Sequence, residues 1–377
     1  MTVKCFETPI LVTRPYLPPL DDFKRGLEEV WANQWLSNNG PLIKRFQNEL
    51  SEYLGVGGMN LALFTNGTLA LELGFQALGL AGADVVTTPF TFVATSHALK
   101  RIGATPVFAD IDPETFCLSP EAAERAITSR TRAIVPVHVY GHPCDVDAFS
   151  RLGEKYGVKI VYDAAHAFGV KIGGRSIATY GDMSMFSFHP TKLFHSCEGG
   201  LLTFRNPALQ ERLEQLRNFA IKDELSCVDV GTNAKMNELQ ALMGLECLKK
   251  IDLLLECRRK IYDTYAEAFA DCADVILVPH SLNKAYVTVL FKDFATRECV
   301  YGELKDKCNV FPRRYFYPLL TDFAPYVYAK GMCPVAEHIA SRVLTLPTYH
   351  GLSIEEVRAI AANVKEIVRR VSGRTCC

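Results

Sequence analysis

One lysine in an apolar stretch is the residue of this sequence best suited to covalent chemistry. Lys192 lies in the segment FSFHPTKLFHSCEGG, residues 186–200, among apolar and aromatic neighbours. Because lysine is usually solvated, one interpretation is a surface turn in which its aliphatic stem covers apolar neighbours. The other is a desolvated amine whose pKa is lowered enough for attack on a carbonyl carbon. The segment alone does not decide between the two.

Two further patterns supply groups that could act with such a lysine. Asp163 directly follows the apolar run at 158–162, so it is either a structural cap or an acid aimed into a site. We favour the site, because the small residues Ala164 and Ala165 follow it. The turn TNGT at 65–68 precedes a helical pattern, where free backbone N–H groups and the helix dipole favour a phosphate. By itself such a turn is more often a plain helix cap.

Together, these elements suit one cofactor. Pyridoxal 5'-phosphate needs an anion cradle, a carboxylate that keeps its pyridinium nitrogen protonated, and a lysine that forms a Schiff base. The chain supplies the 65–68 turn, then Asp163, then Ser187 and Lys192. Each signal is weak alone, and their combination favours this chemistry.

The elements that must position these groups are predicted by alternating patterns. In the first two thirds of the chain, short apolar runs alternate with helical patterns, which predicts a largely parallel sheet covered on both faces. The expected strands lie at 61–64, 85–88, 106–109, 133–137 and 158–162. Ligands of such sheets bind beyond the carboxyl ends of the strands, so we expect the chemistry there.

The pattern changes beyond residue 236. A helical pattern without proline runs from 236 to 272, which is longer than a usual globular helix and could join two domains. Strand-like runs at 275–278 and 286–291, a helix near 296–307 and an amphipathic helix at 353–371 follow, with Ser353 and Glu356 as a capping box. We therefore predict an α/β protein with a large domain at 1–240 and a smaller α+β domain at 241–377.

Composition and charge exclude other classes. The chain has 377 residues, of which 49% are hydrophobic and 22% are charged, which is globular composition. A formal net charge of -1 provides no global field for nucleic acid or an anionic membrane, so we expect neither as a partner. Residues 1–23 contain no apolar run long enough for a signal peptide or a membrane span, which predicts a cytoplasmic protein.

The 13 cysteines predict neither a disulfide framework nor a metal site. Their number is odd, they are scattered from Cys5 to Cys377, and none forms a Cys-x-x-Cys pair. We expect reduced thiols and no bound metal. The terminal Cys376-Cys377 has the form of a prenylation tail, but no phosphate loop of a small GTPase accompanies it, so we expect a disordered tail.

Nearly the whole chain resembles the DegT/DnrJ/EryC1/StrS family of pyridoxal-phosphate sugar aminotransferases. The resemblance is carried by the ordered motifs LSNNGP, NGTLAL, TTPFTFVATSHAL, VFADIDPETF, VHVYGHPCDVDAF, VYDAAHAFG, GDMSMFSFHPTK, CEGGLLTF, NAKMNELQAL and RRYFYPL. It implies the aspartate aminotransferase fold, fold type I. The segments LPPLDDF and WLSNNGP look most like the branch that aminates C4 of a nucleotide-linked 4-keto-6-deoxy sugar.

The resemblance implies a role for each site residue. Lys192 matches the lysine that carries the cofactor and moves a proton to and from the sugar carbon, and Asp163 matches the partner of the pyridinium nitrogen. Phe92 matches an aromatic residue that stacks on the pyridine ring, although a phenylalanine at a helix start is more often core. The other cofactor-binding positions are Gly67, Thr68, Leu69 and Ser187 in the phosphate cradle, His166 beside the cofactor, and Asn233. Asn233 matches an asparagine that reaches the phosphate of the neighbouring subunit, which implies a homodimer with shared active sites.

Three positions bear on how far the resemblance extends. Asn233-Ala234-Lys235 stands where the family often has Asn-Tyr-Arg, and lysine does not replace the bidentate fork of arginine. Cys197 stands where a glycine commonly precedes Glu198. Lys192 is present, which argues against the family's dehydratase offshoot, where a histidine replaces it.

The activity implied is a two-step amino transfer. Glutamate first converts the cofactor to pyridoxamine 5'-phosphate, and the amine then passes to the C4 ketone of a nucleotide-linked, most simply dTDP-linked, 4-keto-6-deoxy sugar. The alternatives are a 3-keto sugar nucleotide or another cyclic ketone as acceptor, and a non-catalytic regulatory relative on the same fold. A Rossmann dehydrogenase is disfavoured, because no G-x-G-x-x-G follows the first strand.

Six further residues near the motifs have open roles. His189 and His195 either contact substrate or are simply hydrogen-bonded structure. The run around RRYFYPL contains Arg313, Arg314, Tyr315 and Tyr317. These four either line the entrance for the nucleotide sugar, as the resemblance suggests, or form a solvated basic turn with core tyrosines.

Overall fold

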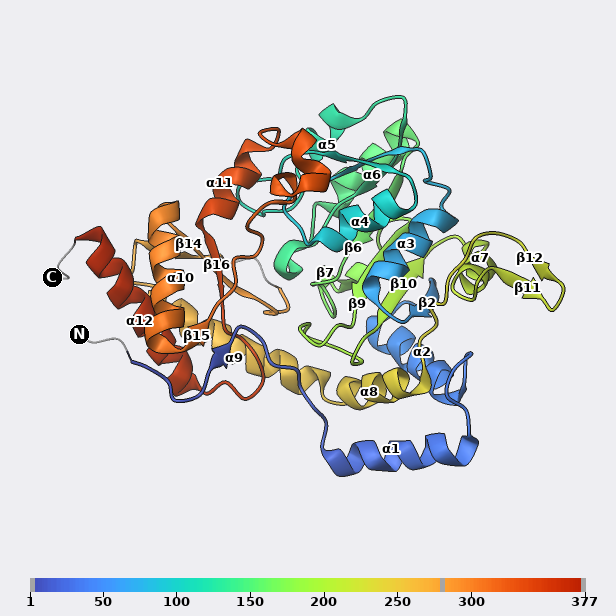
Figure 1. The fold of residues 1–377 in the computed structure, drawn as a ribbon, viewed down its shortest axis with the longest axis horizontal. Coiled ribbons are helices and arrows are strands. Elements are labelled where there is room, and N and C mark those ends of the chain that lie inside the picture. The colour runs from blue at the N-terminus through green and yellow to red at the C-terminus, as the bar shows by residue number, and fades with distance from the viewer. Residues whose placement is uncertain (1–3, 279–281, 374–377) are drawn as a thin grey trace.

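The computed structural model describes residues 4–278 and 282–373 of the chain. Cys376 and Cys377, and with them the question of a lipidated tail, lie outside the described residues. Both ends of the described chain lie on the same side of the molecule (Figure 1). Among the described helices, none has the length and apolar content needed to cross a bilayer.

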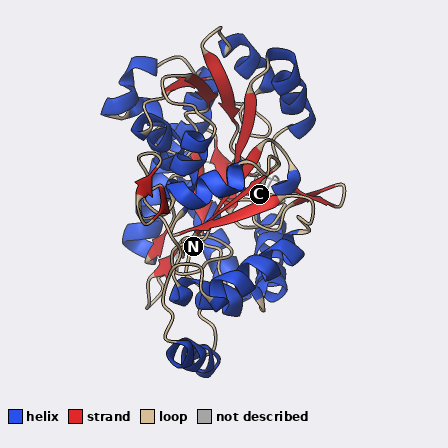
Figure 2. Ribbon diagram, turned by 90° about the vertical axis from the view of Figure 1, so that its right-hand side faces the viewer, coloured by secondary structure: helices blue, strands red, loops and turns tan. Residues whose placement is uncertain are grey.

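A seven-stranded sheet with the strand order β2-β10-β9-β6-β5-β3-β4 forms the centre of the protein (Figure 2). All of its neighbouring strands pair in parallel except β10, which is antiparallel to both β9 and β2. The predicted, largely parallel sheet is therefore confirmed. The bounds are β2 Asn60–Phe64, β3 Asp84–Thr87, β4 Thr105–Phe108, β5 Thr131–Val135, β6 Lys159–Asp163, β9 Met183–Ser187 and β10 Gly200–Phe204.

Both faces of this sheet are buried, as the apolar runs predict. In β2, Leu61 and Leu63 belong to one hydrophobic core, whereas Ala62 and Phe64 belong to another. This division follows from the alternation of side chains along a strand. The first core is shared with α2 (Pro41–Leu54), α6 (Val146–Tyr156) and α8 (Glu238–Leu248), and the second with α3 (Gly67–Ala77), α4 (Val93–Arg101) and α7 (Leu209–Leu216).

A second, smaller assembly is built mostly from the C-terminal third. A three-stranded sheet, β13 (Val275–Leu277), β14 (Val287–Phe291) and β16 (Val343–Leu346), shares a separate core with α9 (Ile251–Phe269), α10 (Phe294–Cys308) and α12 (Ile354–Ser372). Ser353 and Glu356 form the predicted capping box of α12. Phe6 and Ile10 also lie in this core. The division of the chain near residue 240 remains a prediction.

The prediction of a single long helix over residues 236–272 is wrong. The segment forms two helices, α8 and α9, which are separated at Lys249 and Lys250. Almost every residue of α8 is buried, whereas α9 buries one face. The break leaves both lysines exposed. No proline or glycine marks this junction, so the sequence carries no signal for it.

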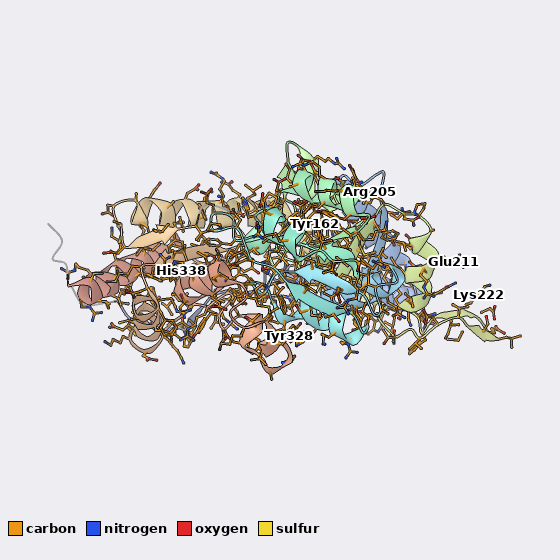
Figure 3. All side chains as sticks on the ribbon, turned by 90° about the horizontal axis from the view of Figure 1, so that it is seen from above. Tyr162, Arg205, Glu211, Lys222, Tyr328 and His338 are labelled. Atoms are coloured by element: carbon orange, nitrogen blue, oxygen red, sulfur yellow. The ribbon has the colours of Figure 1, made fainter. Side chains whose placement is uncertain are left out.

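Two elements project from the body of the protein. Helix α1 (Leu20–Asn33) lies at the bottom of Figures 1 and 2 and packs against α8, where Gly26 permits the close approach: a Cβ there would lie 2.2 Å from Leu242 Cδ1. The hairpin β11–β12, which carries Lys222, extends beyond α7 and Glu211 at the end opposite His338 (Figure 3). The remaining elements are β1 Ile10–Leu11, α5 Pro120–Ala126, β7 Lys171–Ile172, β8 Arg175–Ser176, β11 Ile221–Asp223, β12 Ser226–Cys227, β15 Val310–Phe311, α11 Pro334–Arg342 and the 3-10 helices Val139–Gly141, Ile177–Thr179, Leu320–Asp322 and Ala324–Ala329.

Candidate active site

Lys192 lies in the loop that joins β9 to β10, close to the carboxyl end of the sheet. Strands β6 and β9 are parallel neighbours, with Asp163 opposite Met185, so Asp163 and the lysine loop emerge at the same edge. Burial lowers the pKa of the Lys192 amine, and its attraction to Tyr315 and Asp163 partly offsets that shift. Its side chain is partly buried. The structure therefore favours the desolvated amine over the solvated surface turn.

Asp163 is a buried carboxylic acid held by two donors. Its side chain is 5% exposed. Thr95 Oγ1 donates to Oδ2 at 2.7 Å, and the backbone N–H of Ala165 donates to Oδ1 at 3.1 Å. Burial raises the pKa of Asp163, while these hydrogen bonds and Lys192 act in the opposite direction. A carboxylate placed in this way has lone pairs left for a cationic N–H group.

Thr95 was not among the residues expected in the site. It lies in the motif TFVAT, three residues after Phe92, and that motif is the only sequence signal that points to it. Its side chain is fully buried. Because the Thr95 hydroxyl donates to the Asp163 carboxylate, we infer that Thr95 orients that carboxylate.

Phe92 is an open aromatic ring and not a core residue. It is the N-cap of α4 and is 58% exposed. Thr95, which binds Asp163, lies on the first turn of the same helix. The Phe92 ring and Thr95, which donates to Asp163, therefore both lie at the start of α4. An exposed ring at this place suits stacking on a flat heterocycle.

The start of α3 forms a narrow space against the end of β9. A Cβ at Gly67 would lie 3.3 Å from Ser187 Oγ, and one at Gly200 would lie 2.5 Å from Asn66 O. The Asn66 side chain accepts from the Leu69 amide at 2.9 Å, so the Leu69 N–H that the resemblance assigns to the cradle is already engaged. At a helix start the Gly67 and Thr68 amides have no intrahelical acceptor.

His166 is buried as a neutral imidazole within electrostatic reach of Lys192. Its Nδ1 accepts from the Tyr140 amide at 3.2 Å, which leaves the proton on Nε2. Its ring lies 4.6 Å from that of Tyr286 and 5.9 Å from that of Phe316. Burial, followed by the charge of Lys192, lowers the pKa of His166 well below its usual value.

These expected residues fit pyridoxal phosphate as a set. The desolvated amine, the buried acid and the exposed ring are gathered at the sheet edge, and the start of α3 with Ser187 supplies a cradle for an anion. A side chain at Gly200 would clash with the backbone of Asn66, and one at Gly67 would crowd Ser187, so glycine at both positions allows this close approach. The individual roles remain predictions.

Asn233 is a surface residue next in the chain to a residue that contacts the turn at 65–68. Its side chain is exposed, and its backbone forms a bridge with Asn218. The carbonyl of the next residue, Ala234, accepts from the Thr65 amide at 2.8 Å. Lys235 Nζ donates to Asn218 Oδ1 at 2.7 Å. The role of Asn233 toward a second subunit remains a prediction.

Four of the six residues with open roles have structural partners. His195 is buried and its Nε2 lies 2.6 Å from Tyr16 O, and His189 Nδ1 lies 2.8 Å from Thr191 Oγ1. Arg314 binds Glu298 with two hydrogen bonds, 2.8 and 2.6 Å long. Tyr317 lies under the Arg297 guanidinium, 4.3 Å away. Tyr315, by contrast, interacts electrostatically with Lys192, and the Arg313 guanidinium lies 6.0 Å from the Tyr315 ring.

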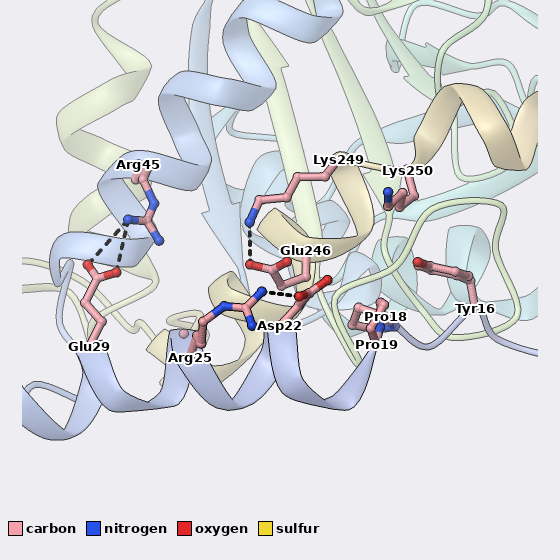
Figure 4. A pocket seen from close by; sticks show the side chains of 11 residues that line it. Tyr16, Pro18, Pro19, Asp22, Arg25, Glu29, Arg45, Glu246, Lys249 and Lys250 are labelled. Carbon is pink, nitrogen blue, oxygen red and sulfur yellow. Dashed lines mark hydrogen bonds and ion pairs between the residues drawn. The ribbon is translucent and has the colours of Figure 1, made fainter.

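One pocket bordered by charged residues lies away from this edge. A cavity of about 390 Å³ lies between α1, α2 and the junction of α8 with α9 (Figure 4). Its charged groups are mostly paired with one another, as in Arg45 with Glu29 and Lys249 with Glu246. Such pairing indicates a solvated cleft between elements.

Cys197 has a backbone conformation that favours glycine. Its φ is 65°, in the left-handed region, where a Cβ costs about 1–2 kcal/mol. Glycine removes this cost but gains more freedom in the unfolded chain, so we expect Cys197→Gly to raise the free energy of unfolding by about 0.5–1 kcal/mol. Urea unfolding measures the difference. Cys5→Gly, at an exposed position with ordinary φ, is the control, and an equal loss of stability in both variants would contradict the expectation.

The comparisons with known proteins agree with this geometry. Residues 20–365 match the DegT/DnrJ/EryC1/StrS aminotransferase family. A dTDP-4-amino-4,6-dideoxy-D-glucose transaminase of Shigella dysenteriae is 42% identical and covers 96% of this chain and 100% of its own length. A transaminase of the same name from Escherichia coli is 38% identical, over 92% of this chain and 96% of its own.

Solved structures place the fold in the same group. The crystal structure of DesI in the presence of its TDP-sugar product is 35% identical with a TM-score of 0.91, covering 98% of this chain and 96% of its own. The structure of NtdA from Bacillus subtilis with bound pyridoxamine phosphate is 27% identical with a TM-score of 0.83. The match covers 93% of this chain and 82% of NtdA. Pyridoxal phosphate is the cofactor of these aminotransferases, and the predicted aspartate aminotransferase-like fold is confirmed. The chain belongs to the DegT/DnrJ/EryC1/StrS aminotransferase family.

Proposed function

We propose that this protein transfers an amino group from glutamate to the C4 ketone of a dTDP-linked 4-keto-6-deoxy sugar. The observation that carries the proposal is the convergence of the Lys192 amine and the buried Asp163 carboxylate at one sheet edge. The relatives named as dTDP-4-amino-4,6-dideoxy-D-glucose transaminases, at 42% and 38% identity, support the choice of sugar and nucleotide. The balanced reaction converts glutamate and the keto sugar to 2-oxoglutarate and the 4-amino sugar.

Different residues of the chain transfer protons and orient the reacting groups. When bound, pyridoxal phosphate supplies an aldehyde for amine exchange and a ring that accepts electrons from the reacting carbon. The Asp163 carboxylate, oriented by Thr95, holds a proton at the ring nitrogen. Lys192 Nζ, whose pKa is lowered by burial, takes a proton from Cα of the amino donor and delivers one to C4 of the sugar.

Three groups serve binding. The amides of Gly67 and Thr68 at the start of α3, together with Ser187, bind the phosphate, because a helix N-terminus favours an anion. Phe92 offers its exposed face to the pyridine ring. His166 is a neutral imidazole with its proton on Nε2. It can therefore donate a hydrogen bond to the cofactor, on the side of Tyr286, without adding positive charge to the site.

A panel of keto sugars tests the choice of acceptor. We expect turnover with the dTDP-linked 4-keto-6-deoxy sugar to exceed that with its GDP-linked counterpart and with a dTDP-linked 3-keto sugar. A relative named GDP-perosamine synthase from Escherichia coli O157:H7 is 32% identical, which makes the GDP sugar the sharpest comparison. Preference for the GDP or 3-keto substrate would overturn the proposed acceptor.

A non-catalytic role is the second candidate. A relative named pleiotropic regulatory protein from Geobacillus stearothermophilus is 30% identical over 88% of this chain. Lys192, Asp163 and Ser187 are all present, which supports catalysis. A purified protein that stays colourless with added pyridoxal phosphate and shows no exchange between glutamate and 2-oxoglutarate would favour the regulatory role.

The same proposal includes a homodimer in which Asn233 of each subunit completes the site of the other. We expect Lys192→Ala and Asn233→Ala homodimers to be nearly inactive, and the mixed dimer to regain up to about half of wild-type activity. In the mixed dimer, one site has an intact Lys192 and receives an intact Asn233 from the other subunit. Co-purification with two different tags followed by the transamination assay measures this recovery. No recovery would place Asn233 within its own subunit's site, and an active Asn233→Ala homodimer would place it outside both sites.

A further inference from the structure

The segment before α1 lies across the molecule and reaches the loop of Lys192. We call residues 4–19 the N-terminal strap (Figure 1). Its β1 pairs in parallel with β15 of the smaller assembly, and Val12 O accepts from the Thr348 amide at 3.1 Å. The strap then passes Tyr16, which borders the pocket in Figure 4, and enters α1.

His195 joins this strap to the lysine loop. The residue is 1% exposed, and its Nε2–H donates to the Tyr16 carbonyl at 2.6 Å. Its Nδ1 accepts from the Cys197 amide at 3.4 Å, and Cys247 Sγ of α8 lies 3.9 Å from Nε2. The ring is therefore held from three sides: by the strap, by its own loop and by α8.

The same loop fixes the position of Lys192. The Lys192 amide donates to His189 O at 2.9 Å, and the Ser196 amide donates to Phe188 O at 3.0 Å. Between them, the Phe194 ring is fully buried and lies 4.3 Å from that of Phe168. Lys192 and His195 thus belong to one turn closed by hydrogen bonds, so we expect a displacement at His195 to shift the backbone of Lys192.

We propose that His195 is a positioning residue for Lys192, and that through it the N-terminal strap determines where the amine lies. The inference rests on the proposed function only in taking Lys192 as the reactive amine. A misplacement of about 1 Å at a reacting group costs about 10²-fold in rate. The strap therefore contributes to catalysis through the position of the Lys192 amine.

The test compares His195→Ala with His195→Gln and His350→Ala. His350 is a matched control, because its ring lies 5.4 Å from that of Tyr16 but it is exposed and outside the lysine loop. We expect His195→Ala to lower kcat by about 10–100-fold with little change in KM for the sugar. Glutamine retains a side-chain N–H for Tyr16 O, so His195→Gln should recover most of the activity, and His350→Ala should retain it.

Two measurements on the cofactor-free protein separate positioning from general damage. We expect chymotrypsin to cleave after Tyr16 about ten times faster in His195→Ala, since the strap loses its anchor. Trinitrobenzenesulfonate should modify Lys192 at a changed rate, as mapped by mass spectrometry, whereas exposed Lys171 reacts equally in all variants. If His195→Ala does not fold, the pair His195→Gln and His195→Asn replaces it, since asparagine is too short to reach Tyr16 O.

The outcomes are distinct. Normal kcat in His195→Ala, or a lowered kcat with unchanged strap cleavage and unchanged Lys192 reactivity, overturns the inference. Failure of the proposed function is recognised separately, because the wild-type protein would then show no exchange between glutamate and 2-oxoglutarate, or no turnover of the dTDP-linked 4-keto sugar, whatever the strap does. A lowered kcat together with both changes, and rescue by glutamine, supports the inference.

Discussion

Replacing Lys192 by alanine is expected to lower transamination by about 10⁴-fold or more. In the proposed mechanism the amine supplies both the covalent anchor and the proton transfer, and loss of a general acid–base group alone costs about 10²–10⁴-fold. Because we propose that the start of α3 and Ser187 bind the phosphate without the help of Lys192, the variant should still bind the cofactor, without the spectrum of a lysine adduct. Steady-state assays and absorbance titration measure the two effects.

Peptide mapping locates the reactive lysine independently. Reduction of the wild-type protein with borohydride should leave the cofactor on Lys192, and no adduct should form there in Lys192→Ala. Lys171→Ala, at an exposed position in β7, serves as the control and should behave as wild type. Near-normal transamination by Lys192→Ala, or a reduced adduct at another lysine, would remove the basis of the proposed mechanism.

Asp163→Asn is expected to lower kcat by about 10²–10³-fold, comparable to the loss of one preorganised electrostatic group. The amide has nearly the shape of the acid but carries no charge to keep the ring nitrogen protonated. Thr95→Val removes the donor to Oδ2, together with the contacts of the same hydroxyl to Thr91 Oγ1 and Phe92 O, but keeps the charge of Asp163, so it should have a smaller effect. Equal kcat values for Asp163→Asn and wild type would contradict the role assigned to the acid.

Asp163→Asn is expected to raise the stability of the cofactor-free protein at pH 7, although it lowers kcat. Burial raises the pKa of Asp163 in the folded state. The contribution of such an acid to stability is complete below its unfolded pKa and is lost as the pH rises through the folded pKa. Asp163→Asn avoids that loss, so its urea midpoint should exceed that of wild type at pH 7, and the gap should close near pH 4. A lower midpoint at pH 7 would contradict this sign.

Much of the framework follows from local patterns in the sequence. The alternation of apolar runs with helical segments predicted the parallel strands, because fully buried strands and amphipathic helices have different periods. The capping box of Ser353 and Glu356 was predicted from residue types three positions apart, since a cap is satisfied within one turn. Asp163 and the turn at 65–68 were found because strand ends can be read from the same patterns.

Contacts between distant segments depend on the order of strands, which local patterns do not contain. Thr95 lies 68 residues from Asp163, and only the packing of α4 against the sheet edge brings its hydroxyl to that carboxylate. His195 meets the carbonyl of Tyr16, which is 179 residues away, so the motif around Lys192 gave no sign of that contact. The break between α8 and α9 likewise has no breaker residue in the sequence.

By itself, the sequence determined which side chains are available for chemistry, the fold class and the family, because these depend on residue types, periodicity and the order of motifs. Only the tertiary structure showed that the Lys192 amine is desolvated and that the Phe92 ring is exposed. It also showed that the Leu69 amide already donates to the Asn66 side chain. Burial and hydrogen bonding are properties of surroundings assembled from the whole chain. The pKa values on which the proposed chemistry depends are therefore set by packing and not by neighbours in the sequence.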